Sequence, residues 1–294
     1  MLPAMRGDGG SSRAPAVLPL RVTTVGESLD CAVVLLRQRA VPLLVVSAVL
    51  AAGEQWLLGV LRAGAGLLPP YYEPHARLHQ WGDWWQILAT GFALEVGIVA
   101  VLGAYAGAAA GPALLGRPAG GWSLWRRARL GRTLPVALLL AVAAWPLAWG
   151  GVVGLLALCA LFGLATPILA MERTGNPLRA LGRSAALSVR GGLRVARVRF
   201  LGYLTWLAIR FALGAAWLAV ADTVLGLAGA GSGWVRWATP VAWGLANTVA
   251  YAALACLDAV LLVESRIRTE GLDIGVRRSR ARGEDETAML GAGR

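Results

Sequence analysis

The sequence predicts an all-α integral membrane protein with six transmembrane helices and three cytoplasmic interfacial amphipathic helices. Three observations lead to this fold class. Hydrophobic residues make up 57% of the 294 residues and charged residues only 15%, which is too apolar for a soluble domain of this length. Six apolar stretches are each near the ~20 residues that a bilayer requires. The 28 basic residues, all of them arginine, fall almost entirely in alternate loops.

The six expected spans share an apolar composition. They cover residues 41–63, 86–111, 133–149, 152–171, 200–227 and 238–263. Twenty-four arginines lie in the amino-terminal segment, in the loops 112–132 and 172–199, and in the carboxyl-terminal tail, whereas the other loops hold only Arg62, Arg77 and Arg236. Because basic loops stay in the cytoplasm, both termini are expected there. Arginine as the sole basic residue, with abundant Ala, Gly and Leu, indicates a GC-rich bacterial genome and hence a bacterial plasma membrane.

Residues 1–23 are expected to form a disordered cytoplasmic leader, because they are rich in Gly, Ser, Pro and Arg and contain no uninterrupted apolar core. Thr24 and Glu27 then have the spacing of a capping box, in which each side chain accepts a hydrogen bond from the other residue's amide. The helix that follows places Leu29 and Val33 on one face. We expect it to lie at the cytoplasmic interface and to lead into the first span.

Two further amphipathic helices are expected in the arginine-rich loops. Ser123 is expected to cap the first, which carries Arg126 and Arg127, and Asn176 with Pro177 begins the second. The apolar positions of the second helix recur at helical spacing: Leu178, Leu181, Ala185 and Val189. Its arginines lie on another face: Arg179, Arg183 and Arg190. Each capped helix would precede one hairpin of two spans, although any polytopic protein with basic loops would show a similar pattern.

The apolar stretch 133–171 is too long for one span, so Pro146 with Gly150-Gly151 is expected to break it into two helices joined by a tight external turn. Small residues at four-residue spacing in the second span, such as Gly103 and Gly107, allow close helix contact. The membrane domain is expected to cover residues 24–266. The polar residues 267–294 mix arginine with acidic residues, which predicts a disordered cytoplasmic tail.

Three stretches resemble motifs of a widespread bacterial membrane family. Residues 20–30 (LRVTTVGESLD) are similar to its opening "L-R-P-L-x-x-G-E-x-L-D". Residues 177–184 (PLRALGRS) resemble its "A-L-x-R-S" interfacial helix, which follows a glutamate, here Glu172. Residues 264–274 (ESRIRTEGLDI) resemble its "D-x-R-x-R-x-E-G-x-D" close to the last span. The family is the multi-span domain that is also attached to some glycerophosphoryl diester phosphodiesterases.

The resemblance brackets residues 20–274 and implies a membrane architecture and a membrane role. It departs from the family pattern at Val22-Thr23, which replace Pro-Leu, and at Glu264, which stands where Asp is usual. No phosphodiesterase domain accompanies the spans, so the resemblance implies no catalytic residue. Transport or scaffolding would follow only by analogy at the level of the fold.

Five ionisable residues fall within or near the ends of the expected spans: Glu54, Glu95, Arg210, Asp222 and Asp258. An Arg or Asp at the centre of a span costs roughly 2.5–3.5 kcal/mol on insertion scales, so each needs a partner, water or a functional reason. Glu54 and Arg210 have similar expected depths, with Glu95 somewhat farther out. We therefore expect Arg210 to pair with one of the two glutamates, either as a structural pin or as a gate or relay for protons or substrate.

Metal and nucleic-acid binding are not expected. His75 and His79 are four residues apart, as two metal ligands on one helix face would be, but Pro74 lies beside the first and no HExxH motif or Cys partner is present. We expect polar surface there and no cofactor. The net charge of +12 flanks the spans without a nucleic-acid-binding fold, so the arginines are expected to contact anionic lipid head groups. The cysteines are too scattered for disulfides or zinc: Cys31, Cys159 and Cys256.

The sequence leaves three functions open. The favoured one is a non-enzymatic scaffold or accessory subunit, whose arginine-rich cytoplasmic side contacts lipid or a membrane-protein partner. The second is a transporter or channel that uses Glu54, Glu95 and Arg210. The third is a lipid-processing membrane enzyme with an external site. We expect no enzymatic activity, because the sequence contains no G-x-S-x-G elbow, no Walker loop and no paired carboxylates on a recognisable catalytic loop.

Overall fold

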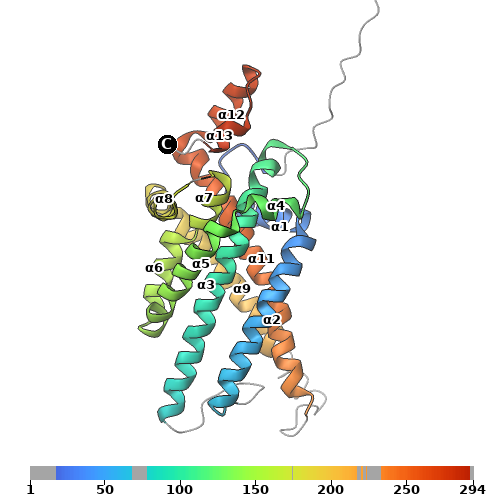
Figure 1. Ribbon diagram of the computed structural model, residues 1–294, viewed down its shortest axis with the longest axis vertical. Helices are drawn as coiled ribbons and strands as arrows, with labels where there is room; N and C mark the ends of the chain where they lie inside the picture. Colours follow the sequence, from blue (N-terminus) through green and yellow to red (C-terminus); the bar gives the residue numbers. More distant parts are fainter. Residues whose placement is uncertain are drawn as a thin grey trace, which may run out of the picture.

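The computed structural model describes residues 18–67, 78–173, 175–216, 220, 223 and 233–291. Helix accounts for 84% of these residues, and no strand occurs among them. Six helical segments are long and apolar enough to cross a membrane, and in Figure 1 they run roughly along the long axis of the molecule. The predicted all-α class and the six apolar helical segments are therefore confirmed.

The described chain begins with α1 (Val25–Gln38), and the candidate spans follow it. They are α2 (Ala40–Gly64), α3 (Leu78–Leu115), α5 (Leu130–Trp149), the pair α6 (Val152–Phe162) and α7 (Ala165–Met171), α9 (Arg194–Phe211) with the π-helical turn η1 (Ala212–Ala216), and α11 (Val235–Glu270). The shorter helices lie toward one end of the bundle (Figure 1): α4 (Ser123–Arg127), α8 (Pro177–Arg190), α12 (Leu272–Ala281) and α13 (Thr287–Gly291).

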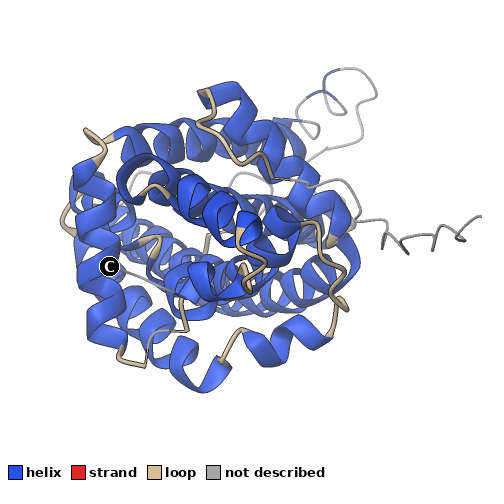
Figure 2. Ribbon diagram, turned by 90° about the horizontal axis from the view of Figure 1, so that it is seen from above, coloured by secondary structure: helices blue, strands red, loops and turns tan. Residues whose placement is uncertain are grey.

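Helix α11 is the central element of the bundle. In its most apolar segment 89% of the residues are buried, against 22–50% in the other candidate spans. It packs against α1, α2, α3 and α9, and Figure 2 shows the helices of the bundle from above. At 1.5 Å per residue, its 36 residues are about 54 Å long, whereas the hydrocarbon core of a bilayer is ~30 Å thick. The helix therefore extends well past any apolar layer.

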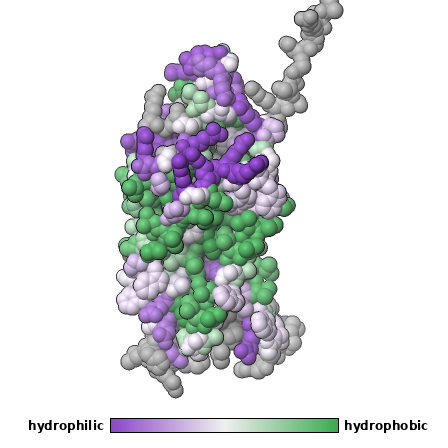
Figure 3. Space-filling model, in the orientation of Figure 1, coloured by the Kyte–Doolittle hydropathy of each residue, from purple (hydrophilic) through white to green (hydrophobic). Residues whose placement is uncertain are grey.

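The surface divides into zones of different polarity. In Figure 3 a band of hydrophobic side chains crosses the middle of the molecule, and hydrophilic side chains gather at the end that carries the short helices. Large apolar side chains of the candidate spans are exposed, such as Val49 of α2 at 68% and Leu138 of α5 at 65%. Extensive exposed apolar surface is unusual for a soluble monomer and is typical of helices that face lipid.

The fourth candidate span is interrupted between α6 and α7, where a single helix over 152–171 was expected. Such a break leaves backbone groups without helical partners, and the buried Ser184 of α8 satisfies two of them. Its hydroxyl donates to the Leu161 carbonyl at 2.7 Å and accepts from the Leu164 amide at 3.2 Å. The interruption of the helix therefore depends on the packing of α8 against it, because Ser184 of α8 satisfies the backbone groups at the break.

The predicted turn at Gly150-Gly151 is confirmed. Helix α5 ends at Trp149, and Gly151 has a φ of 128°, which glycine adopts more readily than other residues. Pro146, in contrast, lies inside α5, so the prediction that it helps to break the helix is wrong. It occupies the last turn, where the missing amide costs a single hydrogen bond, and its carbonyl still accepts from the Gly150 amide at 2.9 Å.

Helices α3 and α7 approach each other closely through the small residues predicted for helix contact. A Cβ atom on Gly107 would lie 2.6 Å from the Pro167 Cα, and one on Gly103 would lie 3.0 Å from the Thr166 hydroxyl oxygen. Only glycine fits at Gly107 without movement of the α7 backbone. This contact holds α7 against the second candidate span.

Two of the three predicted caps are confirmed. The Glu27 amide donates to the Thr24 hydroxyl at 3.3 Å, and the Thr24 amide donates to the Glu27 carboxylate at 2.7 Å. The hydrogen bond from Arg21 and that from the Thr24 amide together lower the pKa of Glu27 to about 2. Asn176 likewise accepts from the Leu178 amide at 2.9 Å.

The third predicted cap, Ser123, is wrong. Its hydroxyl donates to the Gly120 carbonyl at 2.8 Å instead, and Trp122 occupies the cap position. Helix α4 has only five residues, because Ala128 ends it and Arg129 then adopts a left-handed φ of 54°. Such a short helix buries Leu124 and exposes Arg126 and Arg127.

The described segments 18–23 and 267–291 are more ordered than predicted. The boundary expected at residue 266 lies within α11, and the segment expected to be disordered beyond it is helical in α12 and α13. Its mixed charges pair with one another, as in the contact of Arg280 with Glu286 at 3.0 Å. Residues 1–17 of the expected leader lie outside the described chain, but Leu18 and Thr23 are buried, with 2% and 6% exposure. The folded body therefore begins before Thr24.

Candidate functional sites: an arginine-lined pocket and a buried charge cluster

Helix α8 presents three different faces. The inner face is buried and consists mainly of small residues: Ala180, Ser184, Leu187 and Ser188. A second face is apolar and exposed, with Leu178 at 71% and Val189 at 55%. The third face carries the arginines Arg179, Arg183 and Arg190. Because residues three and four apart share a helix face, the members of each set lie on one side of α8. Of the predicted apolar positions, Leu178 and Val189 are exposed, whereas Leu181 is partly buried and packs against the core. The exposed part of the apolar stripe is therefore limited to Leu178 and Val189.

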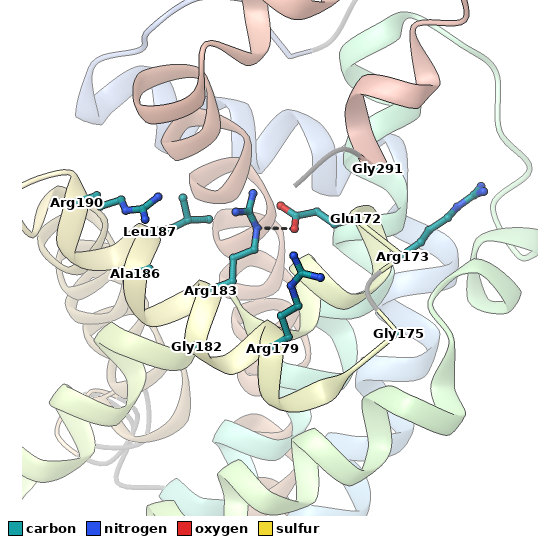
Figure 4. A pocket seen from close by; sticks show the side chains of 10 residues that line it. All are labelled: Glu172, Arg173, Gly175, Arg179, Gly182, Arg183, Ala186, Leu187, Arg190 and Gly291. Atoms are coloured by element: carbon teal, nitrogen blue, oxygen red, sulfur yellow. Dashed lines mark hydrogen bonds and ion pairs between the residues drawn. The ribbon is translucent and has the colours of Figure 1, made fainter. Parts of the chain in front are cut away.

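The arginine face of α8 borders an open pocket of about 590 Å³. The end of α7, the loop to α8, α8 itself and Gly291 of α13 line it. Its charged lining residues are one glutamate and four arginines: Glu172, Arg173, Arg179, Arg183 and Arg190. In Figure 4 Arg179 and Arg183 point to the same side of α8, and Glu172 faces Arg183. Three of these arginines were predicted from helical spacing, and Arg173 was not.

The pocket carries an excess of positive charge. Glu172 is already neutralised, because Arg183 lies 2.5 Å and Arg266 lies 3.5 Å from its carboxylate oxygens. Arg183 also pairs with Glu270 at 2.7 Å. No described acidic side chain pairs with the remaining three arginines: Arg173, Arg179 and Arg190. Guanidinium groups in this situation bind phosphate or carboxylate with paired hydrogen bonds.

Two features fix the rim of the pocket. Burial alone would lower the pKa of Arg183, but its hydrogen bond to Glu172 and the charges of Glu172 and Glu270 outweigh burial and raise that pKa. Arg183 therefore lines the pocket as a charged side chain that its two ion pairs hold in place. Arg173 adopts a left-handed φ of 53°, which non-glycine residues rarely do, and Arg129 donates to its carbonyl at 2.7 Å. A strained backbone of this kind persists only where its surroundings hold it.

A second network of charges lies at the same end of the bundle, around Glu264 of α11. Arg194 of α9 and Arg268 of α11 contact the Glu264 carboxylate at 3.0 and 2.9 Å, and Ser28 of α1 donates to it at 3.1 Å. Both arginines also donate to the Thr23 carbonyl, at 2.8 and 2.9 Å. This network attaches the amino-terminal residues to the centre of the bundle.

The three stretches that carry the family resemblance meet in these two networks. Ser28 comes from the first stretch, Arg183 from the second, and Glu264 with Glu270 from the third. Sequence reasoning assigned none of these contacts, because the partners are far apart along the chain, 236 residues in the case of Ser28 and Glu264. The only feature of the sequence that singled out these three stretches was their resemblance to the family motifs.

Charged residues of three candidate spans meet inside the bundle. The Arg210 guanidinium of α9 lies 2.9 Å from the Glu95 carboxylate of α3, and their side chains are only 4% and 7% exposed. The same guanidinium lies 5.6 Å from the ring centroids of Tyr203 and Tyr251, within the range of cation–π attraction. Of the two glutamates expected as its partner, Arg210 therefore pairs with Glu95.

Glu54 of α2 lies on the other side of Tyr251. The Tyr251 hydroxyl donates to the Glu54 carboxylate, at 2.9 and 2.8 Å from its two oxygens, and the Asn247 amide donates to it at 3.3 Å. Tyr251 thus touches Glu54 with its hydroxyl and Arg210 with its ring. The two glutamates belong to one connected cluster.

Asp258 of α11 is held separately from this cluster. Its carboxylate pairs with Arg199 of α9 at 3.0 Å, and Arg199 also donates to the Cys159 carbonyl at 2.7 Å. The guanidinium passes directly over Gly163, at the break between α6 and α7, where a Cβ atom would overlap it. Arg199 was not predicted as a partner, because it is the last residue of the expected loop 172–199 and was therefore counted with the arginines outside the spans.

The remaining sequence candidates lie elsewhere or outside the described chain. Arg126 and Arg127 are exposed on α4 and do not line the pocket. Asp222 and His75 fall among residues that are not described, and only the backbone of His79, in α3, is described. Within the described ranges, no group of three His, Cys, Asp or Glu side chains is placed to hold a metal ion.

Comparisons with known protein families, with curated proteins and with solved structures find no match for this chain. Its function has to be inferred from the pocket at α8 and the buried charge cluster.

Proposed function

We propose that this chain is a non-enzymatic, multi-pass protein of a bacterial plasma membrane, a scaffold or accessory subunit that binds anionic lipid head groups at its cytoplasmic end. One observation carries the proposal: the arginine-lined pocket lies on α8 beside the exposed apolar stripe of the same helix. A stripe that exposes Leu178 and Val189 is more stable against acyl chains than against water. The neighbouring arginines then lie at the depth of the phosphate groups.

The size and charge of the pocket fit a phosphate-bearing head group. Its volume of about 590 Å³ lies within the usual range for small-molecule sites. Arg173, Arg179 and Arg190 are available to a ligand, while the ion pairs of Glu172 with Arg183 and Arg266 reduce repulsion of an anion by that carboxylate. Ala186 and Leu187 add apolar lining, which suits the carbon atoms where the acyl chains join the head group.

Anionic lipid should stabilise the purified full-length protein through this pocket. In a mild detergent, we expect short-chain phosphatidylglycerol to raise the Tm more than the matching phosphatidylcholine, because a ligand that binds the folded state stabilises it by mass action. The double variant Arg179→Gln, Arg190→Gln should lose most of this additional increase. Thermal unfolding in the presence of each lipid measures the effect.

The matched control for that experiment is the double variant Arg126→Gln, Arg127→Gln. It also removes two positive charges, but from exposed residues of α4 that lie outside the pocket. This variant should keep the response to phosphatidylglycerol. If both double variants lost the additional increase in Tm equally, the protein would respond to net charge alone. That result would contradict lipid binding in the pocket. An equal increase in Tm with glycerol phosphate, which has no acyl chain, would assign the pocket to a soluble phosphate compound instead.

We also propose that the end with the short helices faces the cytoplasm, because 24 of the 28 arginines belong to the segments expected on that side. Single cysteines at Gly82 in α3 and at Arg278 in α12 test this orientation. Both positions are exposed, and the start of α3 and α12 lie at opposite ends of the bundle in Figure 1. In a background without the native cysteines, a membrane-impermeant thiol reagent added to intact cells should label position 82 only. Labelling of position 278 alone would show that the topology is the reverse of the one proposed.

A further inference from the structure

Among the buried acidic residues that the structure describes, Glu54 alone has no arginine partner. Six acidic residues are buried: Glu54, Glu95, Glu172, Asp258, Glu264 and Glu286. The other five each have an arginine within 2.5 to 3.0 Å. Among the described side chains, a tyrosine hydroxyl and an asparagine amide alone donate hydrogen bonds to Glu54, and neither donor carries a charge that would balance an ionised carboxylate.

In the part of the chain that the structure describes, the cluster around Glu54 has two carboxylates and one guanidinium. The ionisable side chains that face it come from α3 (Glu95), from α9 (Tyr203 and Arg210) and from α11 (Tyr251). If both carboxylates were ionised, the cluster would keep an uncompensated negative charge away from water. A buried group in that position binds a proton instead, because neutralisation costs less than desolvating the charge.

The depth of Glu54 strengthens this argument. It follows Ala40, the first residue of α2, by 14 positions, which is about 21 Å at 1.5 Å per residue. Its residue exposure is 5%. Three oxygens of neighbouring α2, α3 and α11 side chains are also buried without a hydrogen-bond donor: those of Gln55, Glu95 and Asn247. The Nε of Arg210 is also buried without a partner, so the three unpaired acceptors outnumber this unpaired donor, and a proton on Glu54 supplies a further donor.

The cluster consists of two similar halves that share Arg210. In one half the Tyr203 hydroxyl donates to the Glu95 carboxylate at 3.4 Å, and in the other the Tyr251 hydroxyl donates to Glu54. The guanidinium lies at the same distance, 5.6 Å, from both rings. Each half therefore offers a carboxylate, a tyrosine hydroxyl and an aromatic face to a single cation.

We propose that Glu54 is an intramembrane proton-binding site and that Arg210 determines which of the two glutamates carries the proton. In the structure Arg210 pairs with Glu95, so Glu95 is ionised and Glu54 is protonated. When Arg210 moves past Tyr251 to Glu54, the Glu54 carboxyl loses its proton and Glu95 takes one up. One proton is transferred, and the charge of the cluster remains zero in both states. This proposal is independent of lipid binding at α8.

Infrared spectroscopy of the full-length protein in lipid vesicles tests the proton site. The C=O stretching band of protonated carboxyl groups should be present at neutral pH and should disappear in Glu54→Gln, which keeps the size and hydrogen-bonding capacity of the side chain. The matched control is Asp258→Asn, a change of another buried acid that already has an arginine partner, and it should keep the band. The site would be overturned if the wild type lacked the band or if Glu54→Gln kept it. A band that appears only when Na⁺ is left out would also overturn it, because Glu54 would then bind Na⁺ in place of a proton.

The variant Glu95→Gln tests the control by Arg210. With Glu54 as the one carboxylate left in the cluster, Arg210 should pair with it, so the band should disappear although Glu54 is still present. Arg210→Gln should have the opposite effect and double the band. A band that persists in Glu95→Gln would overturn the role of Arg210. Size-exclusion profiles identify variants that do not fold, and if these two are among them, the comparison of wild type with Glu54→Gln still decides whether Glu54 holds the proton.

Discussion

Replacing Arg210 by Leu should lower the free energy of unfolding by about 3–5 kcal/mol, which is typical when one side of a buried ion pair is removed. The guanidinium and the Glu95 carboxylate are 2.9 Å apart, with side-chain exposures of 4% and 7%. Once Arg210 is gone, Glu95 has neither water nor another described cation near it and is left buried and unpaired. Unfolding of the purified protein in mixed micelles by increasing SDS measures the loss.

A pair of double variants identifies the partner of Arg210. Arg210→Leu with Glu95→Leu should recover most of the lost stability, because replacing both members of a buried pair by apolar residues can be nearly neutral. Arg210→Leu with Glu54→Leu has the same composition and should recover none of it, since Glu95 remains unpaired. Equal recovery in both double variants would contradict the pairing with Glu95.

Arg266→Leu should be about as damaging, with a loss of about 3–5 kcal/mol. The Arg266 side chain is 2% exposed and pairs with Glu270 at 3.1 Å. It also donates to the carbonyls of Leu290 at 2.7 Å and Met289 at 3.1 Å, so it ties α13 to α11. The same SDS titration measures stability, and limited proteolysis should cut within α12 and α13 before the rest of the protein unfolds.

The matched control for Arg266 is Arg268→Leu, two residues farther along α11. Arg268 pairs with Glu264 at 2.9 Å, but its side chain is 33% exposed, and Glu264 keeps Arg194 as a partner. Ion pairs that remain accessible to water contribute about 0–1 kcal/mol, so this loss should be near 1 kcal/mol. A loss at Arg268 as large as that at Arg266 would contradict burial as the cause.

The number of candidate spans was predictable because each depends on local composition, but the ends of the helices were not. Spans were expected at 86–111 and 238–263, whereas the helices cover Leu78–Leu115 and Val235–Glu270. Helix α11 continues past its apolar segment because polar residues there, such as Arg266 and Glu270, find partners in the α7–α8 loop, on α8 and on α13. Those partners are remote in sequence, so no local sequence pattern predicts the contacts.

The candidate sites were predictable to the same degree. Helical spacing showed which residues of α8 share a face but not which face is buried. The small residues Ala180 and Ser184 face inward, because they let α8 approach the break between α6 and α7, while the bulkier Leu178 points outward. Depth along the spans likewise left both glutamates open as partners of Arg210, and it matched Glu54 more closely than Glu95, which is the observed partner. The choice depends on how three helices are rotated, which a linear sequence does not specify.

The contact of Ser184 with the interrupted span has a consequence for the order of assembly during synthesis. The Leu161 carbonyl and the Leu164 amide are made before Ser184, which is their partner in the folded protein. In an apolar layer, an unsatisfied backbone group costs several kcal/mol. Until residues 177–190 have been made, the fourth candidate span lacks the side chain that satisfies these two groups at its interruption. We therefore expect the interruption to become stable only when α8 docks, so that this part of the bundle reaches its final structure after its later residues are made.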